Sequence, residues 1–221
     1  MNRIDDLPIA RAESVGFTFG QTRILGDVEV EIADGSQTVM TGRSGSGKTT
    51  LLLGLAGLIA PTTGTIAWPG LSHDGGLRRG EIGMVFQAPS LMPELTALQN
   101  VTLPLRLRGV DLAEAEARAL RAMTEVSADD LRNSFPFEMS GGQQQRVAIA
   151  RVLAGGHRLV LADEPTGALD RAHAHDVVRA LRDSVAASGG SLILATHDLE
   201  ISAMFTHHLA VEDGRLVQDP S

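Results

Sequence analysis

Residues 42–50 read GRSGSGKTT, a stretch of glycines and small hydroxyl side chains that follows the apolar run QTVMT at residues 37–41. The stretch matches the pattern G-x-x-x-x-G-K-[ST], which is placed between a strand and a helix. The fixed positions of the pattern are Gly42, Gly47, Lys48 and Thr49. Glycines let the chain curl so that successive backbone N–H groups point inward, and the following helix adds the positive end of its dipole. The backbone itself is therefore predicted to bind a chain of phosphates.

Two side chains of this loop add specific chemistry. Lys48 is predicted to reach the outer phosphates, and Thr49 to offer its hydroxyl to Mg²⁺. A glycine turn without a ligand is the alternative, and the expected strand before the loop and helix after it make that alternative much the weaker one. The residues assigned to phosphate binding are Gly42, Arg43, Ser44, Gly45, Ser46, Gly47, Lys48, Thr49 and Thr50.

The composition limits the classes of protein to consider. A chain of 221 residues with 43% hydrophobic residues suits one domain, with or without an inserted subdomain, around a substantial core. Acidic residues outnumber basic ones by 27 to 19, and the formal charge of -8 argues against a nucleic-acid partner. The absence of cysteine excludes disulfides, thiolate catalysis and cysteine-ligated metals.

The sequence also bears on membrane targeting. The first residues, MNRIDDLPIARAES, lack the apolar core of a signal peptide, and no apolar run reaches the roughly 18 residues of a membrane span. The longest apolar stretch, LLLGLAGLIA at residues 51–60, contains two glycines and indicates a buried helix. We therefore expect a cytoplasmic protein.

Apolar, β-branched runs alternate with helical patterns along the chain. Strands are predicted at residues 14–19, 24–32, 36–41, 63–68, 81–87, 158–163, 191–196 and 207–213. The alternation VEVEI at residues 28–32 indicates an antiparallel sheet with one solvated face, whereas RLVLAD at 158–163 and SLILAT at 191–196 suit parallel strands covered on both faces. A surface helix over residues 111–127 is predicted from one apolar stripe, formed by Leu112, Ala115, Ala119, Leu120, Met123 and Val126.

A pair of carboxylates follows one of the predicted buried strands, in the stretch RLVLADEPTGALD at residues 158–170. Burying charges at the end of an apolar strand is costly unless they meet a cation or perform chemistry. Neighbouring side chains of a strand point to opposite sides, so the two acids should have different roles. Asp163 suits the shell of Mg²⁺ and Glu164 suits a water molecule. The alternative is a pair of solvated acids at a strand end.

A second anion-binding helix start is predicted in MSGGQQQRVAIAR at residues 139–151, where Ser-Gly-Gly-Gln opens a helix. One nucleoside triphosphate needs only one such cradle. Two cradles therefore imply two ligands or two chains.

Taken in order, these stretches resemble the ATP-binding cassette (ABC) proteins over nearly the whole chain. The matching parts are the phosphate loop, VFQ at residues 85–87, the signature at 139–151, LADE at 161–164, ALD at 168–170 and ATHD at 195–198. The resemblance implies an α/β fold of the P-loop NTPase type, with a RecA-like parallel core, an N-terminal antiparallel β lobe and an inserted helical subdomain. We expect one domain over residues 1–221, in which 1–87 and 156–221 form the nucleotide-binding core and 88–155 the helical signature subdomain.

The resemblance also implies an ATPase that uses Mg²⁺ and works as a head-to-tail dimer. Lys48 and Mg²⁺ would supply charge, Glu164 would orient and deprotonate the water, His197 would hold the γ-phosphate, and Gln87 would touch the metal or the water. The implied metal shell is Thr49, Gln87 and Asp163.

Across the implied dimer, the signature of a second copy closes over the ATP. The residues involved are Ser140, Gly141, Gly142 and Gln143, with Asp170 reporting across the interface. Phe19 stands where the family usually has a tyrosine that stacks on adenine, and its face can stack but cannot hydrogen-bond. Two departures from the family pattern remove no catalytic group: Met139 replaces the usual leucine, and Arg43 replaces a frequent proline.

A transporter ATPase without its own membrane segment implies a separate integral-membrane permease, which the family contacts through the segment after Gln87. Here that segment is APSLMPELTALQNVTLPLRLRG at residues 88–109. The sequence of this segment, together with PTGALD and ATHD, resembles the ATPases of macrolide exporters, lipoprotein-releasing complexes, haem exporters and peptide-resistance transporters. We therefore expect a subunit at the cytoplasmic face of the inner or plasma membrane that drives export or extraction of an amphiphilic substrate. A non-transporting ABC ATPase that regulates a membrane complex, such as the cell-division machinery, remains open.

Overall fold

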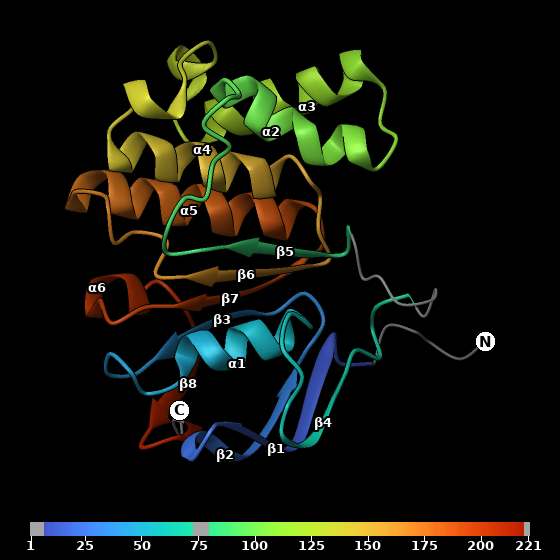
Figure 1. The fold of residues 1–221 in the computed structure, drawn as a ribbon, viewed down its shortest axis with the longest axis vertical. Coiled ribbons are helices and arrows are strands. Elements are labelled where there is room, and N and C mark those ends of the chain that lie inside the picture. Colours follow the sequence, from blue (N-terminus) through green and yellow to red (C-terminus); the bar gives the residue numbers. More distant parts are fainter. Residues whose placement is uncertain (1–6, 73–79, 219–221) are drawn as a thin grey trace.

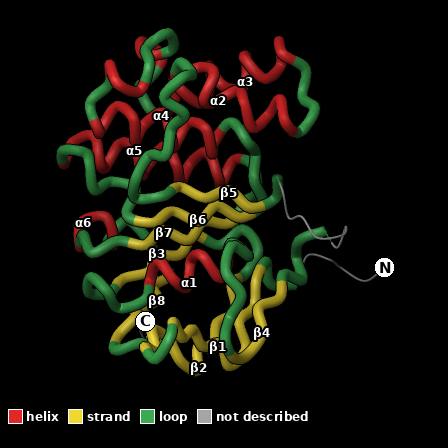
Figure 2. The backbone as a smooth tube through the Cα atoms, in the orientation of Figure 1, coloured by secondary structure: helices red, strands yellow, loops and turns green. Residues whose placement is uncertain are grey.

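A computed structural model describes residues 7–72 and 80–218. The strands that precede the phosphate loop and the acid pair lie in one six-stranded sheet (Figures 1 and 2). Its order is β5 (Ile82–Val85), β6 (Leu159–Asp163), β7 (Ser191–Ala195), β3 (Gln37–Thr41), β8 (His207–Glu212) and β9 (Arg215–Gln218). The first five strands are parallel. Because the carboxyl ends of parallel strands share one edge, the loops after β3, β6 and β7 meet there.

The last strand, β9, was not predicted. It pairs antiparallel with β8 through a tight turn at Asp213 and Gly214, both of which have positive φ angles of 46° and 73°. An Asp-Gly pair is a strong hairpin signal. The prediction failed because β9 is only four residues long and carries a charged and an amide side chain at its ends.

The predicted antiparallel lobe is confirmed as a three-stranded sheet in the order β2, β1, β4. Its strands are β1 (Ala10–Phe19), β2 (Thr22–Ile32) and β4 (Thr63–Ala67). Along β2, Val28 and Ile32 are buried while Glu29 and Glu31 are exposed, as the alternation predicts. Strand β1 begins at Ala10 instead of residue 14, because its first residues pair with the end of β2, with Ala10 opposite Ile32.

Helix α1 (Lys48–Leu55) lies between the two sheets (Figure 1). Its residues Leu51, Leu52 and Leu55 are fully buried and belong to one hydrophobic cluster with Leu159 and Ile193 of the parallel sheet. The prediction of a buried helix after the phosphate loop is therefore confirmed, although the helix ends at Leu55. This packing fixes the start of α1 against the edge of the sheet.

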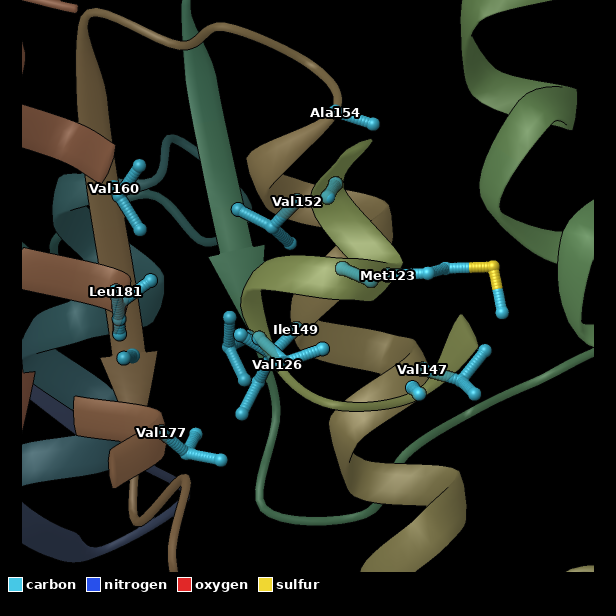
Figure 3. Close-up of a cluster of buried hydrophobic side chains, with 14 of the residues drawn as sticks. Met123, Val126, Val147, Ile149, Val152, Ala154, Val160, Val177 and Leu181 are labelled. Carbon is cyan, nitrogen blue, oxygen red and sulfur yellow. The ribbon is translucent and has the colours of Figure 1, made fainter. Parts of the chain in front are cut away.

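The opposite face of the parallel sheet is covered by α4 (Gly141–Leu153) and α5 (Arg171–Ala187), with α2 (Ala97–Leu107) and α3 (Leu112–Glu125) stacked beyond them (Figure 1). Between these helices and the sheet lies a second hydrophobic cluster, and Figure 3 shows Val160 of β6 and Leu181 of α5 within it. Leu161, the neighbour of Val160, belongs to the cluster around α1. Strand β6 is thus buried on both faces, as its continuous apolar run predicts. The remaining short helices are Asp129–Leu131, Pro136–Glu138 and α6 (Leu199–Ser202).

The predicted surface helix over residues 111–127 is α3, which starts after Asp111 and ends at Glu125. The carboxylate of Asp111 accepts a hydrogen bond from the backbone N–H of Ala113 at 3.0 Å, so it caps the helix. Ala115, Ala119 and Met123 are buried as predicted. Leu112, the first residue of α3, was predicted wrongly, because it is 51% exposed and does not belong to the buried part of the stripe.

Helices α2, α3 and α4 all lie between residues 88 and 155. The division into a nucleotide-binding core and a helical subdomain stays a prediction, and residues 1–6, 73–79 and 219–221 of its ranges lie outside the described residues. Across the described part of the chain, no helix combines the length and the apolarity that a membrane span needs.

Candidate nucleotide-binding site

The glycine loop between β3 and α1 depends on backbone conformations that only glycine adopts easily. Gly42 and Gly47 have φ angles of 149° and 110°. A Cβ atom on Gly42 would lie 2.5 Å from the carbonyl oxygen of Val211, and one on Gly47 would lie 2.6 Å from Cδ2 of Leu25. Both positions therefore exclude a side chain by space as well as by conformation. The loop in this way brings its backbone close to the start of α1.

Lys48 is held beneath the loop. Its side-chain Nζ donates hydrogen bonds to the carbonyl oxygens of Gly42 at 2.7 Å and Arg43 at 3.2 Å, and it lies 3.8 Å from Oε1 of Glu164. The residue is only 6% exposed. Because a buried ammonium needs such partners, its position is fixed and its charge is directed at the cavity beside the loop.

Thr49 and Asp163 form the next pair. The Thr49 hydroxyl donates to Oδ2 of Asp163 at 2.7 Å, and Asp163 is 4% exposed. Burial raises the pKa of the Asp163 carboxyl, the hydrogen bond from Thr49 lowers it, and the nearby charges of Glu164 and Lys48 raise and lower it, respectively. Among the described residues Oδ1 of Asp163 has no hydrogen-bond partner although it is buried. A hydroxyl beside a buried, unused carboxylate oxygen is a donor set that fits Mg²⁺.

Glu164 leaves the strand in a left-handed conformation, with φ at 46°. This conformation is rare for a residue other than glycine, and such strain tends to mark functional sites. Its backbone N–H donates to the carbonyl of Ala195 at 2.9 Å, which ties the turn to β7. The prediction that Asp163 and Glu164 point to opposite sides is wrong, because strand geometry ends at Asp163 and both side chains line one cavity.

His197 lies beside the Glu164 carboxylate. Its ring nitrogen Nδ1 is 3.0 Å from Oε1 and 2.9 Å from Oε2 of Glu164. The Glu164 side chain is mostly buried, whereas that of His197 is largely exposed. The acid at the end of β6 and the histidine after β7 are therefore in contact, as expected from two parallel neighbours whose ends share one edge.

These groups surround one cavity of about 530 Å³. This volume lies within the range of small-molecule sites. Its lining residues are Ile24, Arg43, Ser44, Gly45, Gly47, Lys48, Thr49, Thr50, Gln87, Asp163, Glu164 and His197. All but Ile24 were predicted. Ile24 comes from β2 and carries no signal in the sequence beyond being one apolar residue of a strand.

Other predicted residues lie outside this lining. In the described chain, the cavity is not lined by Gly42 or Ser46, whose place is within the loop itself, nor by Phe19 at the end of β1, which is 55% exposed. The same holds for the signature residues Ser140, Gly141, Gly142 and Gln143 and for Asp170.

The signature residues open α4. The Ser140 hydroxyl accepts from the backbone N–H of Gln143 at 3.3 Å, and the Gln143 side chain accepts from the backbone N–H of Ser140 at 2.8 Å. This reciprocal capping fixes the helix start. A Cβ atom on Gly142 would lie 3.0 Å from the carbonyl oxygen of Ala168, so the signature packs against the loop that carries Asp170.

Asp170 caps α5 in turn. Its carboxylate accepts from the backbone N–H of His173 at 3.0 Å and lies 2.7 Å from that residue's Nδ1. His175 instead approaches Glu200 of α6, at 3.6 Å. Within one chain, therefore, the phosphate loop lines the cavity, whereas the signature and Asp170 lie outside its lining.

Comparisons with known proteins agree with this geometry. The family model described as ABC transporter matches residues 25–167. Relatives from two strains of Staphylococcus epidermidis, each named "Putative hemin import ATP-binding protein HrtA", are 38% identical over 214 residues, which cover 92% of this chain and 96% of theirs.

Solved structures agree as well. The dimeric structure of MJ0796, described as a bacterial ABC transporter cassette, has a TM-score of 0.86 and 33% identity and covers 95% of this chain and 97% of its own. The same cassette bound to ADP and Pi in a post-hydrolysis state has a TM-score of 0.86 and 32% identity, with 95% and 98% covered. The structure of cbiO1 from Clostridium perfringens has a TM-score of 0.82 and 26% identity, with 96% and 88% covered. The predicted P-loop NTPase fold is therefore confirmed, and the chain belongs to the ABC transporter family as an ATPase.

Proposed function

We propose that this ATPase is the nucleotide-binding subunit of a membrane transporter, in which two copies enclose two ATP molecules and drive a separate permease from the cytoplasmic face of the membrane. The observation that carries the proposal is the meeting of Lys48, Glu164 and His197 in one cavity with the phosphate loop. Phosphoryl transfer to water needs positioning and neutralisation of charge more than covalent chemistry. These residues supply both.

The loop and Lys48 bind the outer phosphates of ATP. The backbone N–H groups at the start of α1 point at the anion, and the buried ammonium adds a full positive charge. Thr49, Gln87 and Asp163 would hold Mg²⁺, for which the unused Oδ1 of Asp163 is the strongest support. When bound, Mg²⁺ neutralises charge on the phosphate oxygens.

Glu164 is the general base of the proposed reaction. Its carboxylate is mostly buried and lies between Nδ1 of His197 and the ammonium of Lys48, which together orient it. A carboxylate held in this way orients a water molecule and takes its proton as the water attacks the γ-phosphate. His197, which is largely exposed at the cavity rim, donates to the γ-phosphate once ATP is bound.

A second copy completes the site. The N-terminus of α4 at Ser140–Gln143 lies outside the cavity of its own chain, so it is available to a nucleotide held by another chain. The dimeric state described for the related MJ0796 cassette supports this arrangement. Asp170, at the start of α5, faces the same interface in the proposal.

Phe19→Ala is expected to weaken ATP binding by about 1 kcal/mol, the usual scale of one aromatic contact. Phe19 is exposed at the end of β1, in the same lobe that contributes Ile24 to the cavity, so its ring is free to stack on adenine. Nucleotide titration of the isolated protein measures the change, with Phe137→Ala, another exposed phenylalanine, as the matched control. Equal affinity for Phe19→Ala and the parent protein would remove Phe19 from the site.

For the substrate, we propose an amphiphile that is exported or extracted from the membrane, with hemin as the first to test. The resemblance of residues 88–109 to the ATPases of exporters supports export. The related Staphylococcus epidermidis protein is named for hemin. That relative is named for import, so the experiment on this chain measures the direction of hemin transport as well as the identity of the substrate.

The subunit and its permease, reconstituted in vesicles with the ATPase outside, are expected to hydrolyse ATP faster when hemin is added. Hemin should accumulate inside such vesicles, because the ATPase side is the cytoplasmic side. Loss of hemin from preloaded vesicles would establish import instead. ATPase activity that responds to the membrane partner and to none of hemin, macrolides, lipoproteins or peptides would favour a regulatory role.

A further inference from the structure

The turn between β8 and β9 packs against the strand that contributes Ile24 to the nucleotide cavity. The backbone N–H of Gly26 donates to the carbonyl oxygen of Gly214 in this turn at 2.9 Å. A Cβ atom on Gly214 would lie 2.7 Å from the carbonyl oxygen of Ile24. Strand β2 therefore contacts the turn on both sides of Leu25, and the approach at Ile24 is too close for a side chain on Gly214.

The same hairpin is fixed relative to the phosphate loop. In β8, Ala210 pairs with Thr41, the last residue of β3 before the loop. The next residue, Val211, is 1% exposed, and its carbonyl oxygen is the atom that a Cβ atom on Gly42 would approach to 2.5 Å. Because β8 is paired within the parallel sheet and packs against Gly42, the position of its turn follows the position of the phosphate loop.

Strand β2 carries the adenine side of the proposed site. Ile24 lines the cavity, and Phe19, the residue expected to stack on adenine, lies opposite Thr22 in the pairing of β1 with β2. A displacement of β2 at Ile24 is therefore expected to displace Phe19 as well. The hairpin contacts the phosphate loop through β8 and the adenine side through its turn, so it connects the two halves of one nucleotide site.

The turn requires glycine for two separate reasons. Gly214 has a φ angle of 73°, in the left-handed region, and the atom that it approaches is a backbone oxygen, which cannot rotate away as a side chain can. Gly189, in the loop after α5, has a similar φ angle of 69°. Within the described chain, a Cβ atom on Gly189 would have no neighbour within 4 Å beyond the residues next to it. The two glycines therefore separate the cost of conformation from the cost of close approach.

We propose that Gly214 is a positioning residue that sets the separation between the adenine side of the site, at Ile24 and Phe19, and the phosphate loop. Its missing side chain lets β2 lie close to the turn, and the turn then holds this strand at one distance from the loop. The ligand selected is a nucleotide whose base reaches Phe19 while its phosphates reach Lys48. This inference rests on the proposed function, in which Phe19 stacks on adenine.

The test compares Gly214→Ala with the control Gly189→Ala by titration with Mg·ATP and with Mg·tripolyphosphate, which carries phosphates but no base. Gly214→Ala is expected to weaken ATP binding about five-fold, the scale of one lost aromatic contact, and to change tripolyphosphate binding by less than about two-fold. In the Phe19→Ala protein, the same substitution should change ATP binding by less than about two-fold, because the ring that it displaces is absent. Gly189→Ala should bind both ligands like the parent protein.

The outcomes separate the inference from the proposed function. A parent protein that binds neither ligand defeats the proposed function itself. With a parent that binds ATP, the inference is overturned if Gly214→Ala matches Gly189→Ala, or if it weakens ATP and tripolyphosphate equally, which would indicate a damaged phosphate loop. An undiminished loss when Gly214→Ala is added to Phe19→Ala would overturn it as well.

If Gly214→Ala does not fold, Gly214→Asn and its control Gly189→Asn take its place. Asparagine adopts left-handed φ angles more readily than alanine, so it lowers the conformational cost and keeps the Cβ atom that approaches Ile24. The same difference between ATP and tripolyphosphate is expected, and equal affinities of the two asparagine variants for ATP would overturn the inference.

Discussion

Lys48→Ala is expected to abolish measurable hydrolysis and to weaken ATP binding by about 3 kcal/mol, or about 100-fold. The ammonium is buried, donates to two loop carbonyls and lies 3.8 Å from Glu164. Its removal leaves the carbonyls of Gly42 and Arg43 without their donor and leaves the negative charge of Glu164 uncompensated beside the incoming phosphates. Both effects oppose binding of an anion.

Nucleotide titration and phosphate release measure these two losses. Lys48 is the only lysine of the chain, so an amine-directed reagent has this side chain and the N-terminus as its targets. Inactivation by such a reagent should be prevented by ATP and should be absent in a chain whose N-terminus alone is modified. Unchanged affinity and turnover in Lys48→Ala would defeat the assignment of the phosphate loop.

The local parts of the site could be predicted from the sequence because each is encoded within a few consecutive residues. The phosphate loop, the acid pair and the signature each combine a fixed spacing with a strand end or a helix start. The rule that parallel strands end at one edge then predicts that Lys48, Asp163 and His197 meet. Apart from the start of β1 and the whole of β9, the strand positions follow from patterns of period two and from continuous apolar runs. The two-sided burial of β6 follows from its continuous apolar run.

Features that depend on partners distant in sequence could not be predicted. Gln145 and Phe86 are 59 positions apart, and nothing in either stretch indicates their contact. At Glu164 the chain takes a left-handed φ of 46°, so the alternation of side chains along β6 does not extend to this residue, and nothing in the local sequence indicates that turn. Ile24 and Leu112 show the same limit for apolar residues: Ile24 lines the cavity and Leu112 is exposed, and the neighbouring sequence distinguishes neither from a core residue.

Glu164→Gln is expected to reduce hydrolysis by at least the roughly 10²-fold that loss of a general base costs. The amide keeps the shape of the carboxylate and one oxygen that can face Nδ1 of His197, which lies 2.9 Å away in the parent protein. ATP binding should survive, because Lys48, Thr49 and Asp163 are unchanged. The neighbouring Lys48 also loses a competing negative charge, which favours the phosphates.

A nucleotide that is bound and not cleaved should hold two copies together. ATP lies between the phosphate loop of one chain and Ser140–Gly142 of the other in the proposed dimer, so Glu164→Gln should change from monomer to dimer when ATP is added. ADP should not cause this change, because it lacks the γ-phosphate that the start of α4 would contact. Size-exclusion chromatography with light scattering, with ATP, with ADP and without nucleotide, measures the mass directly.

The matched control is Glu114→Gln, which removes an exposed carboxylate paired with Arg118 on α3. This residue is far in sequence from the phosphate loop and from the signature. It should hydrolyse ATP like the parent protein and should not accumulate as an ATP-bound dimer. A Glu164→Gln protein that binds ATP yet stays monomeric, both alone at high concentration and with its reconstituted permease, would contradict the shared site. The phosphate loop would then remain a binding site, but the signature at Ser140 would need a ligand other than the γ-phosphate of the facing copy.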